Sequence, residues 1–270
     1  IQSPQLLQLS GIGPAALLQR HGIHVVKDMP AVGANLHDHL QSRMIWTCKE
    51  PVTVNDVMQS PWRKLMMGLQ FAFTRKGPLG WYAGLAGGFA RTRPELNRPD
   101  VQFHFFPYST DRTDPSLHPF SGFTISVCKL RPESRGTLEI QSANAADAPA
   151  IRPNLLERES DVATMLDGVK LLRKLAATPA LQRWINTERD PGPECASDDQ
   201  LIDYIRAKGF TVYHPVGTCK MGNDSAAVVD NELRVHGVTG LRVIDASVMP
   251  VVTSGNTNAA TIMKIGRAHV

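Results

Sequence analysis

The sequence lacks the residues and runs that mark several classes of protein. It has only four cysteines in 270 residues, far apart at positions 48, 128, 195 and 219. None are spaced as Cys-x-x-Cys, so the cysteines indicate neither a zinc site nor a disulfide framework. No apolar run approaches the roughly 18 to 20 residues that cross a bilayer, so we predict no membrane span.

An excess of charge of one sign is also missing. The chain has 29 basic and 25 acidic residues, a net charge of +4 that is spread evenly along the sequence. We therefore predict no nucleic-acid partner. The amino end carries no basic-then-apolar signal segment. We expect a cytoplasmic protein in a reducing compartment, with attachment to the periphery of the inner membrane as the alternative.

The apolar pattern predicts a mixture of helices and strands. Residues 3–26 read as helix, turn and a strand at 23–26. Alternation at 101–105 and 123–128 predicts half-buried strands of an antiparallel sheet, and residues 136–140 are assigned to the same sheet. The sequence thus indicates an α/β (α+β) fold.

Further elements follow in the second half of the chain. Apolar residues recur at helical spacing over 162–175, and Ser197 with Gln200 forms a capping box before a second helix. A strand is predicted at 241–245, and a helix opens after Asn258.

A histidine motif, YHPVGTCKMG, occupies residues 213–222. The proline after His214 favours extended backbone at that residue, and glycines at 217 and 222 allow sharp turns beside a ligand. An isolated His-Pro pair is more often a structural turn, so the motif alone leaves both interpretations open.

A second informative stretch reads LRVIDASVMP at 241–250 and TSGNTNAATIM at 253–263. The strand predicted there ends at the carboxylate of Asp245. The turn at 255–258 leads into a predicted helix, whose first N–H groups can face a polar ligand. An ordinary helix N-cap at 256–258 is the alternative interpretation.

Four ordered motifs together resemble the glucose–methanol–choline oxidoreductase family. They are SPQLLQLSGIG at 3–13, VGANLHDHL at 32–40, HPVGT at 214–218, and the tail with DAS at 245–247 and NTN at 256–258. The tail is most similar to the choline dehydrogenase and aliphatic alcohol dehydrogenase branch.

The resemblance implies a domain organisation. Residues 1–40 and 211–263 would form part of an FAD-binding domain, and residues 41–210 a substrate-binding domain with an antiparallel sheet flanked by helices. Residues 264–270 are predicted to be a non-native tail, because residues 265–270 match one reading frame of a common sequencing adapter. The chain is expected to be truncated at both ends.

The resemblance also implies a catalytic pair. It places His214 as the base that removes the hydroxyl proton of an alcohol, a role that an imidazole suits at neutral pH. Asn256 would hold the substrate oxygen as negative charge develops there. An amide cannot be the base, so we predict a single-base mechanism through His214.

FAD is the cofactor that the family implies. Asp245 and Ala246 match the segment beside its ribityl and pyrophosphate groups. Thr257 and Asn258 begin the helix whose positive end would face the pyrimidine edge of the flavin, and Asn35 would line the flavin from the other side.

Weaker candidates surround this set. His104 and Tyr213 are predicted to line the substrate pocket. Trp81 and Tyr82 are further candidates, but large aromatic residues more often belong to the core. His37, Asp38 and His39 resemble a metal fragment, but no third ligand of matching spacing appears, so we predict no metal.

The predicted activity is oxidation of a small primary alcohol to an aldehyde, with a quinone or another electron acceptor. An oxygen-using alcohol or choline oxidase, a hydroxynitrile lyase and a non-catalytic remnant are the alternatives. The dinucleotide fingerprint Gly-x-Gly-x-x-Gly is absent from the sequence. We therefore expect the chain alone neither to retain FAD nor to oxidise alcohols.

Overall fold

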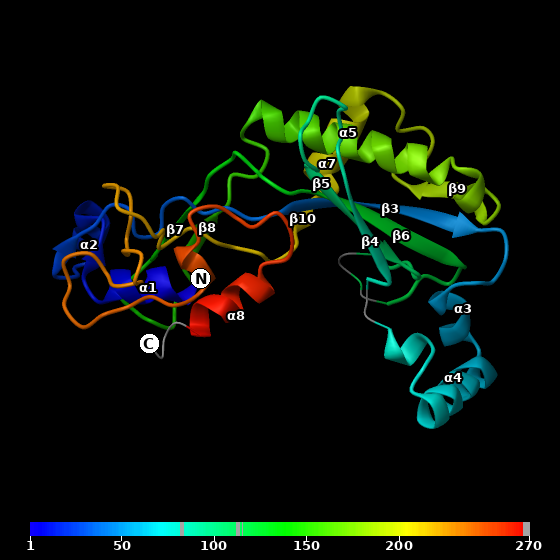
Figure 1. Ribbon diagram of the computed structural model, residues 1–270, viewed down its shortest axis with the longest axis horizontal. Coiled ribbons are helices and arrows are strands. Elements are labelled where there is room, and N and C mark those ends of the chain that lie inside the picture. The colour runs from blue at the N-terminus through cyan, green and yellow to red at the C-terminus, as the bar shows by residue number, and fades with distance from the viewer. Residues whose placement is uncertain (82–83, 112–113, 115, 267–270) are drawn as a thin grey trace. The chain divides into compact units, whose positions relative to one another are not determined.

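The computed structural model describes residues 1–81, 84–111, 114 and 116–266. The chain divides into two compact units (Figure 1). Two of the chain positions at which it passes between units, after residues 40 and 210, coincide with the predicted domain boundaries. The first unit comprises Ile1–Leu40, Leu130–Asp161 and Thr211–Val270, and the second comprises Gln41–Lys129 and Val162–Phe210.

The segment Leu130–Asp161 lies in the first unit, whereas the sequence placed it within the 41–210 domain. Here β7 (Thr137–Glu139) and β8 (Ala150–Arg152) pair antiparallel in a sheet of their own. The side-chain amide of the buried Gln8 donates to the Leu138 carbonyl at 3.1 Å and ties this sheet to α1 (Gln2–Leu9). The prediction that residues 136–140 extend the large sheet is therefore wrong.

Short elements build the rest of the first unit. They are β1 (Ile12–Gly13), α2 (Ala15–Arg20), β2 (Lys27–Asp28), η2 (Ala246–Val248) and α8 (Asn258–Gly266). β1 pairs in parallel with β2. The strand β2 begins at Lys27, directly after the segment 23–26 that was predicted as a strand, so the predicted bounds are wrong. The core of this unit includes Leu7, Ile12, Met29, Val32, Cys219, Val228, Val229, Leu233, Val235, Val243 and Val248.

The strand predicted at residues 241–245 does not form. Arg242 makes only an isolated bridge with Arg234, and η2 follows directly. Apolar residues of this stretch still reach the core through turns, so the apolar pattern was sound but its assignment to a strand was wrong. The helix predicted after Asn258 is confirmed as α8.

The second unit is built around a six-stranded sheet. Its order is β10 (Phe210–Thr211), β3 (Leu40–Cys48), β6 (Gly122–Lys129), β5 (Val101–Phe106) and β4 (Ala86–Ala90), and β9 (Ile185–Asp190) also pairs with β3. The predicted strands at 101–105 and 123–128 are confirmed as β5 and β6, which pair antiparallel, but β6 is buried on both faces and not half-buried as predicted.

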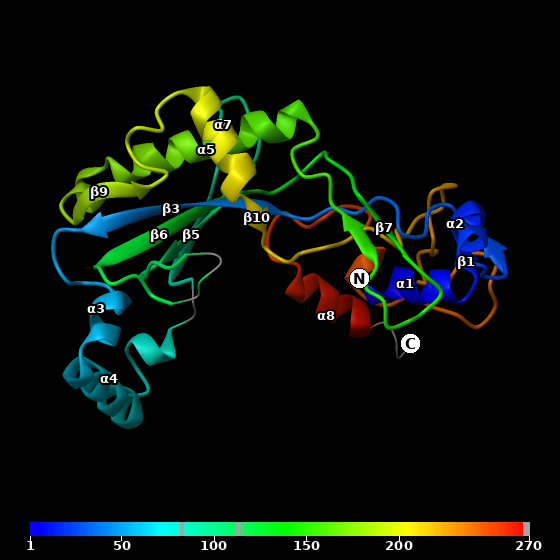
Figure 2. The same cartoon turned by 180° about the vertical axis from the view of Figure 1, so that it is seen from behind.

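Helices lie along one side of this sheet in both ribbon views (Figures 1 and 2). They are α5 (Glu159–Ala176) and α7 (Asp198–Lys208), and both predicted helices are confirmed. The capping box of Ser197 and Gln200 is present at the start of α7. The remaining elements of the unit are α3 (Val54–Gln59), α4 (Pro61–Thr74), η1 (Pro78–Gly80) and α6 (Pro179–Gln182).

Alternation along β5 assigns its side chains to two faces. Phe103 and Phe105 line an apolar cavity of about 650 Å³ together with Leu171 and Leu175 of α5. His104 and Phe106 therefore point to the opposite face of the sheet.

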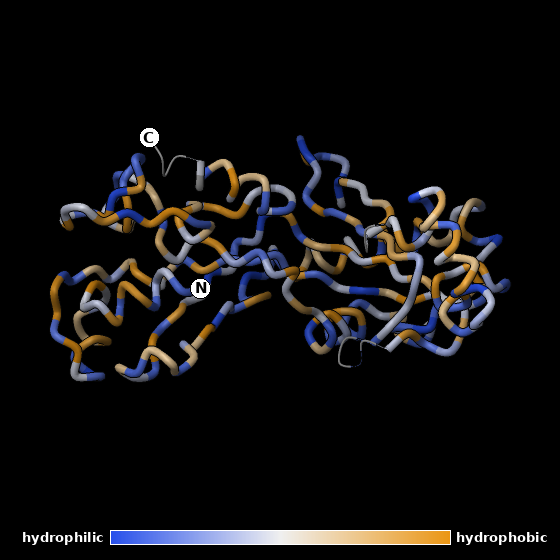
Figure 3. Tube along the Cα trace, turned by 90° about the horizontal axis from the view of Figure 1, so that it is seen from below, coloured by the Kyte–Doolittle hydropathy of each residue, from blue (hydrophilic) through white to orange (hydrophobic). Residues whose placement is uncertain are grey.

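No helix among the described residues is both long and apolar enough to cross a membrane. Figure 3 shows hydrophobic and hydrophilic residues intermixed along the trace.

Candidate active site

Two motifs that are far apart in the sequence lie side by side within the first unit. His37 and Val216 form an antiparallel bridge, with backbone hydrogen bonds of 3.0 and 2.9 Å in the two directions. The Val212 N–H donates to the His39 carbonyl at 3.0 Å. The loop at 32–40 therefore serves as the strand partner of the segment that carries His214.

Asp38 fixes the backbone at His214. Its carboxylate accepts the His214 backbone N–H at 2.9 Å and the Thr211 hydroxyl. Thr211 in turn accepts the backbone N–H of Tyr213 at 2.8 Å, where φ is 62°. Burial raises the pKa of Asp38, although these hydrogen bonds oppose the increase. A buried carboxylate thus sets the direction in which the His214 side chain leaves the loop.

The His214 ring contacts a second imidazole. His214 Nδ1 lies 3.0 Å from His39 Nδ1, and the two rings meet edge to face with centroids 5.2 Å apart. The other nitrogen of His39, Nε2, lies 3.0 Å from the Leu130 carbonyl oxygen. His39 is fully buried and His214 is half-buried. One edge of the His214 ring is therefore anchored in the protein, which leaves Nε2 at its outer edge.

Asn256 lies at that outer edge. Its Nδ2 is 3.4 Å from His214 Nε2, although the two residues are 42 positions apart in the sequence. Asn256 is exposed, so the place where the two polar atoms meet is open to a ligand. The structure thus brings together the two side chains that the sequence proposed as a catalytic pair.

The environment of His214 favours the neutral imidazole. Partial burial lowers its pKa below the ordinary value, and the Asp38 carboxylate opposes this change. At neutral pH the ring is therefore unprotonated and can accept a proton.

Asn35 performs a structural task in this site. It adopts φ of 59°, and its amide donates to the carbonyls of Gly217 and Pro250 at 3.4 and 3.3 Å. Its oxygen accepts from Arg135 Nε at 3.2 Å. These contacts join Asn35 to three other segments of the first unit, so the side chain holds these loops together.

Asp245 is engaged in a similar way. Its carboxylate accepts the Ser247 backbone N–H at 2.7 Å, which caps η2, and it accepts the Ser3 hydroxyl. Burial by itself raises the pKa of Asp245, but the hydrogen bonds from Ser247 and Ser3 outweigh it and lower that pKa. Asp245 is therefore an anion, and Ala246 follows it in the first turn of η2.

The start of α8 lies next to Asn256. Thr257 is buried and its carbonyl accepts the Thr261 N–H at 3.0 Å, whereas Asn258, the first residue of α8, is exposed. The first N–H groups of a helix point away from its body, and they carry partial positive charge. This helix end can therefore bind an electronegative group close to Asn256.

The predicted substrate-pocket residues do not all belong to the unit that holds His214. His104 belongs to the second unit, where its Nδ1 lies 3.4 Å from Ser126 Oγ. Tyr213 is next to His214 in sequence but its side chain is 79% exposed. Trp81 is also exposed, and Tyr82 lies outside the described residues.

The run from His37 to His39 divides its side chains between different partners. Asp38 binds backbone and hydroxyl groups, and His39 binds Leu130 and His214. Among the residues that the structure describes, no group of three His, Cys, Asp or Glu side chains could hold a metal ion. Sequence reasoning missed the contact of His39 with His214, and only the position of His39 in the loop motif could have suggested it.

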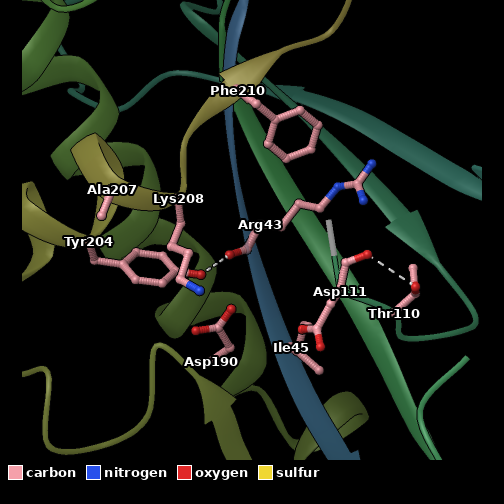
Figure 4. Close-up of a pocket in the computed structure, with 9 residues that line it drawn as sticks. All are labelled: Arg43, Ile45, Thr110, Asp111, Asp190, Tyr204, Ala207, Lys208 and Phe210. Carbon is pink, nitrogen blue, oxygen red and sulfur yellow. Dashed lines mark hydrogen bonds between the residues drawn. The ribbon is translucent and has the colours of Figure 1, made fainter. Parts of the chain in front are cut away.

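A separate polar cavity of about 370 Å³ lies in the second unit (Figure 4). Arg43 and Asp111 line it, and the Tyr204 hydroxyl donates to the Arg43 backbone carbonyl. The Arg43 guanidinium lies over the Phe210 ring at 4.6 Å. Neither His214 nor Asn256 lines this cavity.

Comparison with known proteins identifies the family. Residues 132–264 match the sequence model of a family described as GMC oxidoreductase. The chain belongs to the GMC oxidoreductase family.

Two similar GMC oxidoreductase relatives are bacterial dehydrogenases. The alcohol dehydrogenase [acceptor] of Pseudomonas putida is 41% identical over 97% of this chain and 48% of its own length. The oxygen-dependent choline dehydrogenase of Cronobacter sakazakii is 42% identical over 97% of this chain and 47% of its own. The chain thus spans about half the length of the curated relatives it matches.

Solved structures share the fold of this GMC oxidoreductase chain. Pyridoxine 4-oxidase from Mesorbium loti superposes with a TM-score of 0.82 at 28% identity, over 99% of this chain and 48% of that one. Formate oxidase from Aspergillus oryzae, in a study of FAD modification, superposes with a TM-score of 0.90 at 25% identity. That match covers 98% of this chain and 51% of the oxidase.

Proposed function

We propose that the whole protein containing this chain is an FAD-dependent oxidoreductase that oxidises a small primary alcohol to an aldehyde. The supporting observation is the 3.4 Å approach of Asn256 Nδ2 to His214 Nε2. A hydroxyl group placed between these atoms would donate its proton to the imidazole and accept a hydrogen bond from the amide.

His214 is the base in this proposal. Its lowered pKa keeps the ring neutral at pH 7, so Nε2 can take the hydroxyl proton. Asn256 donates to the same oxygen, and this hydrogen bond strengthens as the oxygen acquires negative charge. Asp38 keeps the imidazole aimed at this point through the backbone of His214.

The residues around the pair fit a flavin. The start of α8 offers N–H groups and partial positive charge beside Asn256, and the anionic Asp245 lies at the start of η2, next to Ala246. FAD, when bound, would accept the hydride removed from the carbinol carbon of the substrate. Thr257 and Asn258 would hold its ring edge, and the Asn35 side chain would hold the surrounding loops.

The names of the relatives support a dehydrogenase, with either an unspecified acceptor or oxygen. The Pseudomonas putida protein is named with an unspecified acceptor and the Cronobacter sakazakii protein as oxygen-dependent, and both are more similar in sequence to this chain than the oxidases are. We propose a quinone or another small acceptor for the electrons. The substrate is a small alcohol of the class to which choline belongs.

Replacing His214 in the whole protein tests this function. We expect His214→Ala to lower kcat/KM for alcohols by roughly 10²- to 10⁴-fold, the contribution of a positioned base. His24→Ala is the control, because His24 is an exposed histidine outside the site. The measurement is anaerobic bleaching of the flavin by alcohol.

Three results would point elsewhere. Oxygen uptake during turnover would identify an oxidase. Cleavage of a cyanohydrin without flavin bleaching would identify a hydroxynitrile lyase. Equal behaviour of His214→Ala and the unaltered protein would identify a non-catalytic remnant.

We also propose that the protein attaches to the periphery of an anionic membrane through α4. The apolar residues of α4 recur at helical spacing and are exposed, with Phe73 at 84% and Trp62 at 67%. Residues 57–94 contain six Lys or Arg residues and no Asp or Glu. In Figure 1, α4 lies away from the sheet of its unit. An amphipathic helix flanked by cations fits the surface of an anionic bilayer.

Co-sedimentation of the whole protein with vesicles tests the attachment. We expect binding to vesicles that contain phosphatidylglycerol and much less to pure phosphatidylcholine vesicles. The double variant W62S/F73S should lose binding, whereas Val26→Ser, an exposed apolar change in the other unit, should keep it. Failure of the unaltered protein to sediment with either kind of vesicle would contradict the attachment.

A further inference from the structure

A linear series of hydrogen-bond contacts runs through the two imidazoles. It begins at the Leu130 carbonyl oxygen, 3.0 Å from His39 Nε2, and continues from His39 Nδ1 to His214 Nδ1 at 3.0 Å. It ends at Asn256 Nδ2, 3.4 Å from His214 Nε2. Each contact joins one donor to one acceptor. Once the donor at one end is known, the position of the hydrogen on each imidazole ring follows.

The ends of the series carry unambiguous groups. A backbone carbonyl only accepts, so His39 Nε2 must carry a hydrogen. The Asn256 amide nitrogen only donates, so His214 Nε2 must carry a lone pair. A neutral His39 then accepts at Nδ1, and His214 donates to it from Nδ1. This arrangement satisfies all three contacts with both rings neutral.

We propose that His39 is a positioning residue that holds His214 in the Nδ1–H tautomer. This inference rests on the proposed function, in which Nε2 of His214 takes the hydroxyl proton. In the other tautomer Nε2 would already carry a hydrogen, and the ring could not act as a base toward the substrate.

The burial of His39 enforces this assignment. The side chain is fully buried, and a charged imidazolium there would be costly. Its Nε2 is held by Leu130, and its backbone carbonyl accepts the Val212 N–H at 3.0 Å. The ring therefore has a fixed place and a fixed acceptor atom facing His214.

The same contact assists the step after proton transfer. When His214 Nε2 gains the proton, Nδ1–H still donates to His39 Nδ1, so the imidazolium keeps its hydrogen bond. A hydrogen bond from a charged donor is stronger than one from a neutral donor. His39 thus stabilises the product of proton transfer as well as the reactive tautomer, without touching the substrate.

The test is ¹⁵N NMR of the whole protein labelled at histidine, with two variants of His39. We expect the unaltered protein to show His214 protonated at Nδ1 and unprotonated at Nε2. His39→Leu removes the acceptor and should give a mixture of tautomers. His39→Asn carries an acceptor oxygen on Cγ, where histidine has Nδ1, and should restore the Nδ1–H form. His24→Leu is the control in the same unit.

Turnover of alcohol by the same proteins gives a second readout. We expect His39→Leu to lower kcat by roughly 10²- to 10⁴-fold with little change in KM, because only proton transfer is affected. His39→Asn should regain most of this loss. Asparagine can restore the acceptor that faces His214 but not the contact of the histidine ring with Leu130. Recovery of kcat in His39→Asn would therefore assign the effect to the position of His214 and not to packing around Leu130.

The outcomes are distinguishable from failure of the proposed function. A His214 that carries its hydrogen on Nε2 in the unaltered protein overturns the inference, and so does an unchanged tautomer in a folded His39→Leu variant. If the tautomers behave as expected but no alcohol reduces the flavin, the role of His39 stands and the proposed reaction is wrong.

Discussion

His37 is a buried imidazole with a strongly perturbed acidity. Burial is the largest cause, the charge of Arg135 adds to it, and the pKa of His37 falls to about 4 from its ordinary 6.5. The folded protein therefore holds His37 neutral in a range of pH where the unfolded chain binds a proton.

The sign of the effect on stability follows from this difference. Between pH 6.5 and about 4 the unfolded state binds more protons, so the free energy of unfolding falls as the pH falls through this range. Above pH 6.5 the protonation of His37 does not lower the free energy of unfolding. Below about pH 4 it lowers this free energy by about 3 kcal/mol. Urea unfolding of the whole protein at several pH values should show this slope, and His37→Gln should flatten it. An equal slope in both proteins would assign the effect to other groups.

Asn256 has a catalytic role that differs from that of His214. We expect Asn256→Ala to lower kcat by roughly 10²- to 10³-fold, because it removes one donor to the developing alkoxide. The pKa that governs kcat/KM should stay with His214, since the base is retained. The measurement is the pH dependence of flavin reduction, and loss of the fall in rate at acid pH in Asn256→Ala would contradict the division of roles.

At this scale the sequence predicted which residues meet but not how they bond. His214 and Asn256 belong to recognisable motifs, and the structure places them in contact. The role of His39 depends on a contact with His214, which is 175 positions away in the sequence. No local sequence pattern predicts such a contact. The three protein partners of Asn35 are non-local in the same way.

Among the elements, the paired segments at 36–39 and 211–216 depend on Gly217. Gly217 has φ of 94°, and an added Cβ would lie 2.2 Å from the Asn35 carbonyl oxygen and 2.8 Å from the His37 ring. Only glycine accommodates both the backbone conformation and this close approach. The presentation of His214 therefore requires this residue.

Gly217→Ala should destabilise the protein and lower alcohol turnover. Gly240→Ala is a matched control, because Gly240 also has positive φ, 76°, but its added Cβ meets nothing within 4 Å. We expect a loss of about 1 kcal/mol for Gly240→Ala from backbone strain alone and several times more for Gly217→Ala. Thermal unfolding and flavin reduction would measure both, and equal losses would show that the close approach is unimportant.

Periodicity predicted the long elements and failed for the short ones. β5, β6, α5 and α7 each run over several residues, so their residues can show the regular spacing of a strand or a helix in the sequence. The segments at 136–140 and 241–245 carry apolar residues too, but the first pairs with the short β8 and the second makes one isolated bridge, to Arg234. Alternation indicates which side chains are buried and does not indicate which strand lies alongside.

For the whole molecule, the chain alone should not retain FAD. It spans about half the length of its curated relatives, and it lacks the glycine-rich fingerprint that binds the phosphates of the dinucleotide. We expect purified chain to be colourless and prone to aggregate, because apolar residues such as Phe73 and Met263 are exposed. Flavin absorbance after gel filtration is the measurement. A soluble yellow protein would contradict the expectation.

The order in which the segments enter the two units bears on how the polypeptide is made. The first unit takes its parts from three stretches of chain, and the second unit takes its parts from the two stretches between them. The ribosome synthesises these stretches alternately. Neither unit can therefore complete its fold before most of the other unit has been synthesised. Folding during synthesis is thereby delayed, and apolar residues of the segments made first stay exposed until the segments that cover them are made. Chaperone dependence in the cell is the expected consequence.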